Sequence, residues 1–283
     1  MDQFLRFPGF RLKALTLSYD DGVIQDKRLI DIMNKYGLKG TFNLNSGKFR
    51  PEDCESVTVP TGTTKDKLKL SEAVKLYKNS GHEVAVHGYE HLMLNYFTDP
   101  EIVNEIAADR INLENAFGTI VNGMAYAYGK FNDRIVACLE KCGIAYSRTT
   151  VKGEEFSLPE NWLLWHPTCH HNAPELMELA RKFIETPLRN QFCDLKVFFL
   201  WGHSYEFDRD NNWDVIEKFA EYIGKREDIW YATNKEIYEY VTAYKRLEIS
   251  MDSKRAYNPT NLTLFTKVGD RVYEIKPGET VVF

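Results

Sequence analysis

Cysteine is scarce in this sequence of 283 residues, and it is not arranged for cross-links or for thiolate metal sites. The cysteines number five, which is odd, and no two of them are spaced Cys-x-x-Cys. Neither a disulfide framework nor a cysteine-ligated zinc site is therefore indicated. Cys138 and Cys142 lie four residues apart on a predicted helix, where packing against apolar neighbours explains them. This cysteine usage suits a reducing compartment.

Long apolar runs and dense basic clusters are also missing. No stretch of 18 uninterrupted apolar residues occurs, so no membrane-spanning helix is predicted. The first residues, Met1 to Gly9, lack the basic region and apolar run of a secretion signal, so we expect a cytoplasmic protein, although a processed secreted chain would look the same. The net charge of -5, without a Lys/Arg cluster, argues against nucleic acid as a partner.

What the sequence does contain is an alternation of β-rich runs and helical patterns up to about residue 245. The predicted strands are 14–19, 41–44, 83–86, 123–126, 144–147, 162–165, 196–200 and 229–231. The predicted helices are 27–36, 70–79, 100–117, 133–142, 174–185, 213–224 and 234–245. Repeated strand–helix units predict an α/β fold with a parallel sheet, either doubly wound or closed into a barrel.

Two regions interrupt this alternation. Residues 47–67 are rich in Pro, Gly and Thr and are predicted to form a long loop, a feature that is often functional in compact domains. After about residue 250, three short strands are predicted at 261–267, 271–275 and 280–283, separated by turns. We therefore divide the chain into a catalytic unit, residues 1–249, and a small C-terminal β appendage, residues 250–283.

Polar side chains gather where the predicted strands end. In a parallel α/β sheet the carboxyl ends of the strands converge on one face, which holds the active site. The residues at or just beyond such ends are Asp20, Asp21, His87, His91, Tyr128, His166, His170, His171 and His203. This sorting predicts one site built from several strands.

The pair His87 and His91 predicts a metal site. Two imidazoles four residues apart can share one metal if the loop coils into a helical turn. Alone, such a pair is coincidental in roughly two cases of three. With Asp21 it provides one oxygen and two nitrogen ligands, which leaves positions open for water and substrate. Because adjacent residues leaving a strand point to opposite sides, Asp20 remains available as a general base.

Three motifs resemble the polysaccharide deacetylases, that is, carbohydrate esterase family four with its NodB-homology domain. They are Thr16 to Gly22 (TLSYDDG), His87-x-x-x-His91 and Leu200 to His203 (LWGH), and their order and spacing match over residues 12–245. The resemblance implies a distorted (β/α)7 barrel.

The same resemblance implies a role for each matching residue. Asp20 would be the catalytic base, and Asp21, His87 and His91 would bind a divalent metal, zinc first, with cobalt, nickel and iron as alternatives. The backbone N–H of Tyr128 would help to form the oxyanion hole, and His203 would protonate the leaving amine.

The sequence departs from the family pattern in the later motifs. Ala125 and Ala127 stand where the third motif usually has Arg and Pro. No Asp occurs within residues 165–171, where the fourth motif usually supplies one to tune the catalytic histidine. Gly88 follows the first metal-binding histidine, where Ser or Thr is common.

Glu206, three residues after His203, is a candidate replacement for the missing Asp; a solvated loop carboxylate is the equally weighted alternative. The candidate substrate contacts are Trp165, His170, Trp201 and Glu206. For the aromatic residues, core packing is the competing interpretation.

Together these features predict a metal-dependent hydrolase that removes an acetyl group, most readily N-acetyl, from a carbohydrate. This activity is that of a hydrolase acting on the C–N bond of a linear amide. Three alternatives stay open: an amidohydrolase for a small allantoin-like amide, a two-histidine, one-carboxylate iron oxygenase, and a non-catalytic carbohydrate-binding relative. Retention of Asp20, which the metal does not need, argues against the non-catalytic alternative.

Overall fold

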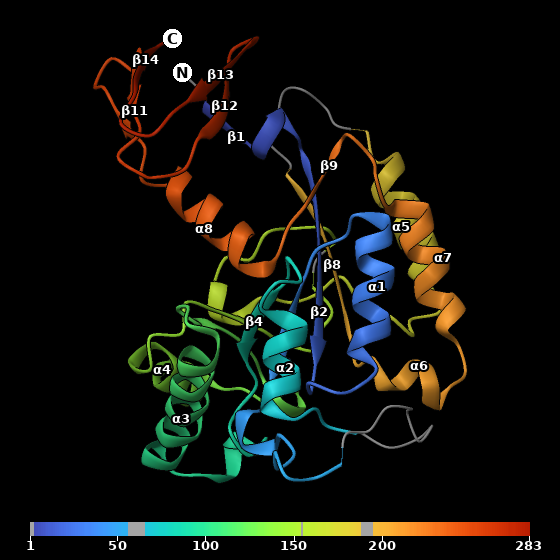
Figure 1. Cartoon of the computed structure of the whole chain (residues 1–283). Coiled ribbons are helices and arrows are strands. Elements are labelled where there is room, and N and C mark those ends of the chain that lie inside the picture. The colour runs from blue at the N-terminus through green and yellow to red at the C-terminus, as the bar shows by residue number, and fades with distance from the viewer. Residues whose placement is uncertain (1–2, 56–65, 154, 188–194) are drawn as a thin grey trace.

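A curved parallel sheet with helices around it dominates the computed structural model, which describes residues 3–55, 66–153, 155–187 and 195–283 (Figure 1). Its strands are β2 (Lys13–Asp20), β3 (Gly40–Leu44), β4 (Glu83–Val86), β5 (Gly123–Ala125), β6 (Tyr146–Arg148), β7 (Cys169–His170), β8 (Lys196–Gly202) and β9 (Ile229–Tyr231). Their order is β6-β5-β4-β3-β2-β8-β7, and β9 pairs with the first residues of β2.

The two ends of this sheet are linked through the segment between β6 and β7. Trp165 forms a parallel bridge with Arg148 at the end of β6. A few residues later, the backbone N–H of Thr168 donates to the carbonyl of Phe199 in β8, at 2.8 Å. The predicted distorted (β/α)7 barrel is confirmed.

The two faces of the sheet form two separate cores, because successive side chains of a strand point to opposite sides. In β2, Leu15, Leu17 and Tyr19 belong to the larger cluster, which packs under the outer helices. Ala14 belongs to a smaller cluster inside the barrel. The remaining alternate residues of β2 become polar towards its carboxyl end, ending at Asp20. The barrel interior is therefore apolar at one end and polar at the other.

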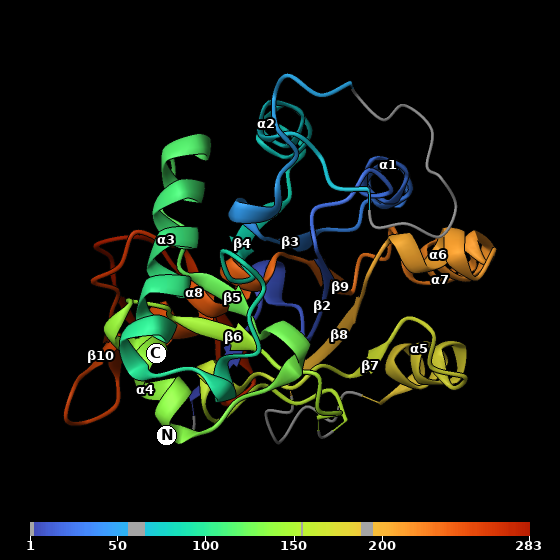
Figure 2. The ribbon, with the colours of Figure 1, turned by 90° about the horizontal axis from the view of Figure 1, so that it is seen from below.

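The outer helices surround the sheet, as Figure 2 shows. They are α1 (Asp26–Tyr36), α2 (Leu70–Tyr77), α3 (Asp99–Phe117), α4 (Asp133–Lys141), α5 (Leu176–Glu185), α6 (Tyr205–Arg209) and α7 (Trp213–Ile223). The last helix, α8 (Asn234–Tyr244), lies between the barrel and the C-terminal strands (Figure 1). Its Ile237, Tyr240 and Val241 belong to the interior cluster, and Asn234 Oδ1 accepts a hydrogen bond from Thr16 at 2.8 Å. The helix therefore covers the apolar end of the barrel.

Most predicted elements are present, but the structure differs at several places. The predicted strand at 162–165 is a 3₁₀ turn, Trp162–Leu164, because the side chain of Asn161 caps it by accepting from the N–H of Leu163. The short strand β7 and the short helix α6 were not predicted. Residues 56–65 of the predicted loop lie outside the described residues.

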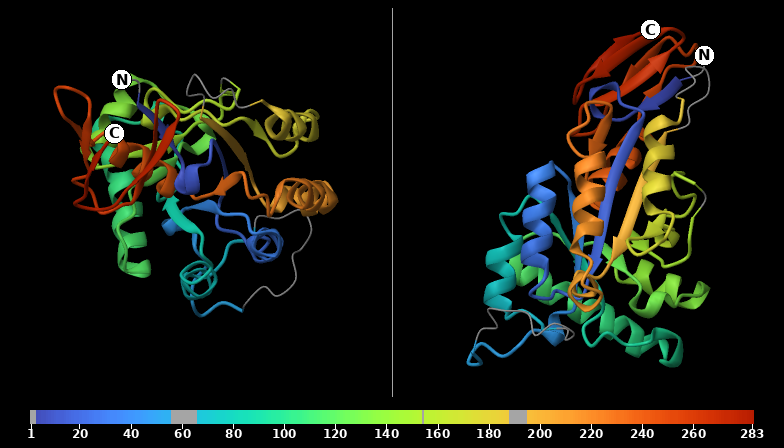
Figure 3. Two further views of the ribbon diagram at one scale, coloured as in Figure 1. Left: turned by 90° about the horizontal axis from the view of Figure 1, so that it is seen from above. Right: turned by 90° about the vertical axis from the view of Figure 1, so that its right-hand side faces the viewer.

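The C-terminal strands form two small antiparallel sheets at the end of the barrel opposite the carboxyl ends of its strands (Figure 3). One contains β1 (Gln3–Arg6), β12 (Leu264–Val268) and β13 (Arg271–Ile275); the other contains β10 (Glu248–Ile249), β11 (Arg255–Tyr257) and β14 (Thr280–Val282). β1 comes from the N-terminus, so both ends of the chain contribute. The strands β1, β10 and β11, which lie outside the barrel, were not predicted. The division of the chain at residue 249 stays a prediction.

A buried carboxyl group, Asp26, joins three elements near the polar end of the barrel. It begins α1, and its Oδ2 accepts hydrogen bonds from the Tyr77 hydroxyl of α2 at 2.5 Å and from the N–H of Val23 at 3.3 Å. Its Oδ1 accepts from the hydroxyl of Ser204, which follows β8, at 2.5 Å. Burial raises the pKa of Asp26 to about 7, although these hydrogen bonds oppose the rise.

Replacing Asp26 with Asn removes this titration and makes the unfolding free energy less dependent on pH. The folded protein keeps Asp26 protonated up to about pH 7, whereas the unfolded chain ionises it near 3.8. Relative to Asp26→Asn, the wild type keeps its full stability below about pH 4 and loses it as pH rises through about 7, by at most about 4 kcal/mol. Urea unfolding with EDTA across this range measures the difference. Asp31→Asn, an exposed position on the same helix, is the control; a difference that does not change with pH contradicts the prediction.

Candidate metal centre

The loop after β4 brings His87 and His91 together. Their Nε2 atoms lie 3.2 Å apart. The loop brings them together without the helical turn that was considered, because it passes through left-handed backbone at Gly88 (φ 89°) and His91 (φ 56°). A side chain at Gly88 would also place its Cβ 2.9 Å from Glu105 Oε1, which explains a glycine where the family commonly has Ser or Thr.

Two carboxylates of α3 hold this loop in place. Asp109 accepts hydrogen bonds from the N–H of His87 at 3.0 Å and of Ser46 at 2.7 Å. Glu105 Oε1 accepts from the N–H of Glu90 at 2.8 Å. Asp109 is fully buried and Glu105 nearly so. Sequence reasoning missed both, since buried carboxylates in a helix look like ordinary polar positions.

The tautomer of His87 suits a metal ligand. Its Nδ1 lies 2.9 Å from the carbonyl oxygen of Ala125, so the ring nitrogen that carries hydrogen is Nδ1. The Nε2 lone pair then points towards His91, as metal-binding histidines require. Burial lowers the pKa of His87 and lowers that of His91 to about 4, so both rings are neutral at neutral pH.

Asp21 completes a set of three possible ligands. One donor atom each from Asp21, His87 and His91 lies within 4.8 Å of the other two. Asp21 has left-handed backbone (φ 87°), and its N–H donates to the carbonyl of Asn43 at 3.0 Å, which turns the chain sharply at the end of β2. The donor set of one carboxylate and two neutral imidazoles fits a divalent cation such as zinc.

Lys67 lies beside this set. Its ammonium group is 3.2 Å from Asp21 Oδ1 and also donates to the backbone carbonyl of Asp21. A further hydrogen bond of 3.2 Å reaches Asn45, whose amide donates to the carbonyls of His87 and Gly88. Lys67 thus balances the charge of Asp21.

Asp20, next to this set, is held by a buried arginine that sequence reasoning missed. Arg148, at the end of β6, pairs with Asp20 Oδ2 and also donates to the hydroxyl of Ser18 at 3.2 Å. Asn43 donates to the other oxygen, Oδ1, at 2.8 Å. The guanidinium carbon lies 4.5 Å from the ring centre of Trp201. Arg148 directly follows a predicted strand, so the strand-end rule that selected the histidines also applies to it.

Asp20 stays ionised although it is buried. Burial alone raises its pKa, but the charge of Arg148, supported by His87 and His203, outweighs burial, and the pKa lies below its usual value. The Nε2 atoms of His87 and His203 lie 3.7 and 3.8 Å from Asp20 Oδ2. A carboxylate in this state can accept a proton.

His203 lies between Asp20 and Glu206. Its Nδ1 is 3.5 Å from Glu206 Oε2, so the structure brings together the pair that was considered as a replacement for the missing Asp. Burial lowers the pKa of His203, but Glu206 and Asp20 outweigh this effect and the pKa is raised. His170 and His171 also approach Glu206 Oε2, at 3.1 and 3.2 Å.

The other predicted site residues differ in their surroundings. The exposed ring of Tyr128 lies 4.5 Å from that of His91, and its backbone is left-handed (φ 56°). Trp201 contacts Arg148 and His170 within the site. Trp165, by contrast, is 1% exposed and packs against Phe199 in the barrel interior. Core packing, the competing interpretation, therefore accounts for Trp165.

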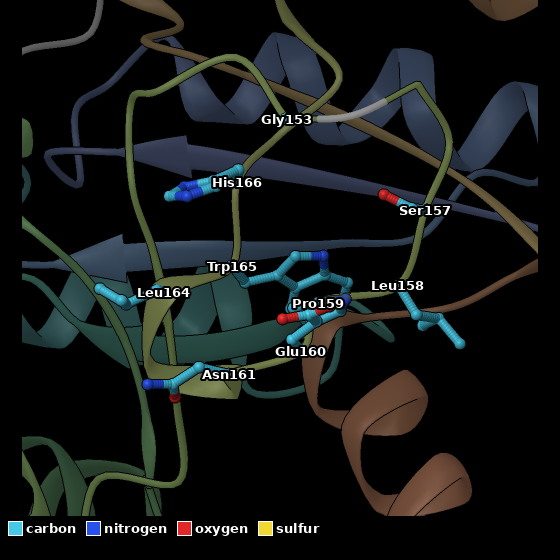
Figure 4. Close-up of a pocket in the computed structure, with 9 residues that line it drawn as sticks. All are labelled: Gly153, Ser157, Leu158, Pro159, Glu160, Asn161, Leu164, Trp165 and His166. Atoms are coloured by element: carbon cyan, nitrogen blue, oxygen red, sulfur yellow. The ribbon is translucent and has the colours of Figure 1, made fainter.

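Trp165 instead lines a cavity of about 520 Å³ (Figure 4). Its lining residues are Gly153, Ser157, Leu158, Pro159, Glu160, Asn161, Leu164, Trp165 and His166, none of which belongs to the possible ligand set or to the Asp20 neighbourhood. His166 is bound to Thr149 at 2.6 Å. In Figure 4, Trp165 lies between His166 and Leu158.

Comparison with known proteins finds a similarity to one protein family. Residues 10–147 match the family model for polysaccharide deacetylase. The predicted resemblance to the polysaccharide deacetylases is confirmed. A chitin deacetylase from Cryptococcus neoformans is 26% identical over 129 residues, which are 45% of this chain and 24% of that protein. The chain thus spans about a quarter of the length of this curated relative.

Solved structures support the fold. A Mycobacterium smegmatis protein assigned to the polysaccharide deacetylases is 17% identical, covers 85% of this chain and 94% of its own, and has a TM-score of 0.58. The Xyl-CE4 domain of a xylanase from the hindgut metagenome of Trinervitermes trinervoides is also 17% identical, covers 82% and 92%, and has a TM-score of 0.51. At this identity, the likeness establishes a shared fold.

Arg148→Met is expected to destabilise the protein strongly, because it leaves the Asp20 charge buried without its main partner. Breaking a buried pair in this way costs about 3–5 kcal/mol. The matched control is Arg134→Met, which removes an exposed ion pair with Asp99 (2.7 Å) and should cost at most about 1 kcal/mol. Urea unfolding of both variants measures the losses. Equal losses in the two variants contradict the assigned role of Arg148.

Proposed function

We propose that this protein is a metal-dependent deacetylase that hydrolyses an N-acetyl group of a carbohydrate. The observation that carries the proposal is an ionised Asp20 beside three donor atoms, from Asp21, His87 and His91, that fit a divalent cation. The match to the polysaccharide deacetylase model supports the reaction class. The carbohydrate substrate class is proposed on the basis of this match and of the similar chitin deacetylase.

Asp21, His87 and His91 would hold the cation, with zinc as the first expectation. When bound, it would supply Lewis-acid polarisation of the acetyl carbonyl and of the attacking water. His87 is prepared for this role by its Nδ1 contact with Ala125, and the loop by the carboxylates of α3. Contacts within the protein thus fix the ring orientation of His87 and the conformation of its loop.

Asp20 would act as the general base. Oδ1 is engaged by Asn43, while Oδ2 faces Arg148, His87 and His203. Arg148 keeps the carboxylate ionised and fixes its orientation, so the proton of the attacking water has an acceptor at neutral pH. General-base catalysis of this kind contributes about 10²–10⁴-fold to a rate.

His203 would donate the proton to the departing amine. Its Nε2 lies 3.8 Å from Asp20 Oδ2, next to the proposed base, and its Nδ1 faces Glu206. The carboxylate of Glu206 favours the charged imidazolium, which holds a proton ready for donation. The backbone N–H of Tyr128 would stabilise the developing oxyanion.

Acetate release from N-acetylglucosamine oligomers, measured with one equivalent of zinc, tests the proposal. Asp20→Asn should keep its zinc and lose about 10²–10⁴-fold in rate, because only the proton acceptor is removed. Asp21→Asn should lose zinc as well as activity. Asp31→Asn, at an exposed position on α1, should resemble the wild type. A wild type that binds no zinc, or an Asp20→Asn variant with unchanged activity, contradicts the proposal.

A further inference from the structure

A second cluster of possible metal ligands lies on the other side of His203. Donor atoms of His170, His203 and Glu206 lie within 4.8 Å of one another. Glu206 Oε2 is the common neighbour, 3.1 Å from His170 Nε2 and 3.5 Å from His203 Nδ1. His171 Nε2 is 3.2 Å from the same oxygen. Nothing in the proposed reaction requires three imidazoles around one carboxylate.

The close contacts in this cluster leave several buried polar atoms without a hydrogen bond. Within the described residues, Glu206 Oε2, His203 Nδ1 and both ring nitrogens of His171 are buried without a hydrogen-bond partner. The distances are short, yet none of these contacts is a hydrogen bond. Buried polar atoms without partners are rare in native proteins and indicate a missing ion or water.

His171 cannot turn elsewhere to find a partner. It is fully buried, and its ring stacks on Phe207 at 4.1 Å and on Tyr19 at 5.7 Å. A Cβ on Gly202 would lie 1.9 Å from His171 Nδ1, so only glycine allows the ring to lie there. The fold therefore fixes an imidazole without a hydrogen-bond partner beside Glu206 Oε2.

We propose that His170, His203 and Glu206 form a second binding site for a divalent cation, with Zn²⁺ as the expected ion. Two imidazole nitrogens and one carboxylate oxygen are the ligand types that zinc prefers. A cation bound among these three residues would neutralise the negative charge on Glu206 Oε2. It would also give His203 Nδ1 a binding partner. His171 would then hold the carboxylate in place from the side away from the ion.

The second site should bind more weakly than the site at Asp21. The N–H of Asn172 donates to His170 Nδ1 at 3.1 Å, so the hydrogen of the neutral ring lies on Nε2, the atom that must bind the cation. His87 has the opposite and favourable arrangement. When the group bonded to the second ring nitrogen of a metal-binding histidine does not favour the required tautomer, metal affinity falls by roughly 10–100-fold.

Occupation of the second site would inhibit the enzyme; this consequence rests on the proposed function. His203 needs both ring nitrogens protonated in order to give a proton from Nε2 to the leaving amine. A cation on Nδ1 excludes that state and takes Glu206 away from the imidazole. Zinc beyond one equivalent should therefore lower the rate of acetate release.

Calorimetric titration of the metal-free protein with Zn²⁺ tests the site directly. The wild type should bind two equivalents, the second roughly 10–100-fold more weakly than the first. His170→Gln, at a partly exposed position, should bind only the tight one, and Asp21→Asn only the weak one. The matched control is His166→Gln, a histidine outside both clusters, which should still bind two.

A wild type that binds a single equivalent, or a His170→Gln variant that keeps two, overturns the second site. Cobalt absorption spectra of the wild type provide an independent measurement, since a second set of bands should appear only after the first equivalent. Inhibition by excess zinc should disappear in His170→Gln; if it persists, the inhibitory role is wrong. Because binding is measured without substrate, failure of the second site is distinguished from failure of the proposed deacetylase activity.

Discussion

The arrangement of the polar end of the barrel depends on the burial of one negative charge, that of Asp20. A carboxylate inside a protein is tolerated only when its charge is compensated and its oxygens are hydrogen-bonded. Arg148 supplies the compensating charge, Asn43 occupies the second oxygen, and His203 approaches the first. This one group therefore links β2, to which it belongs, with β3, β6 and the end of β8.

The rest of the fold separates the polar end from the apolar one. Inside the barrel, apolar side chains of α8 pack with Val197 and Phe199 of β8 at the end nearest the C-terminal strands. At the other end, carboxylates of α3 replace apolar packing and fix the His87 loop through its backbone. The site is thus supported by the sheet on one side and by a helix on the other, which keeps its side chains in place before any ligand binds.

Much of this was predictable from the sequence, since strand ends converge in a parallel sheet and the metal-ligand spacing is local. Arg148 also follows a predicted strand, but the family pattern places its arginine at position 125, where this chain has alanine. Asp109 and Glu105 were not predictable, because helix spacing does not tell a buried carboxylate from a solvated one. The predicted strand at Trp162 is wrong because a side-chain cap favours a 3₁₀ turn, and the loop after His87 is not helical because Gly88 has left-handed backbone.

The central claim is that Asp21, and not Asp20, shares a divalent cation with His87 and His91, while Asp20 stays paired with Arg148. A crystal structure with one equivalent of zinc, with anomalous diffraction recorded at the zinc edge, tests this most directly. We expect one strong peak about 2.0–2.2 Å from one oxygen of Asp21 and from both imidazole nitrogens, with the Arg148 pair intact. A peak bound to Asp20, or no peak among these three residues, would contradict it.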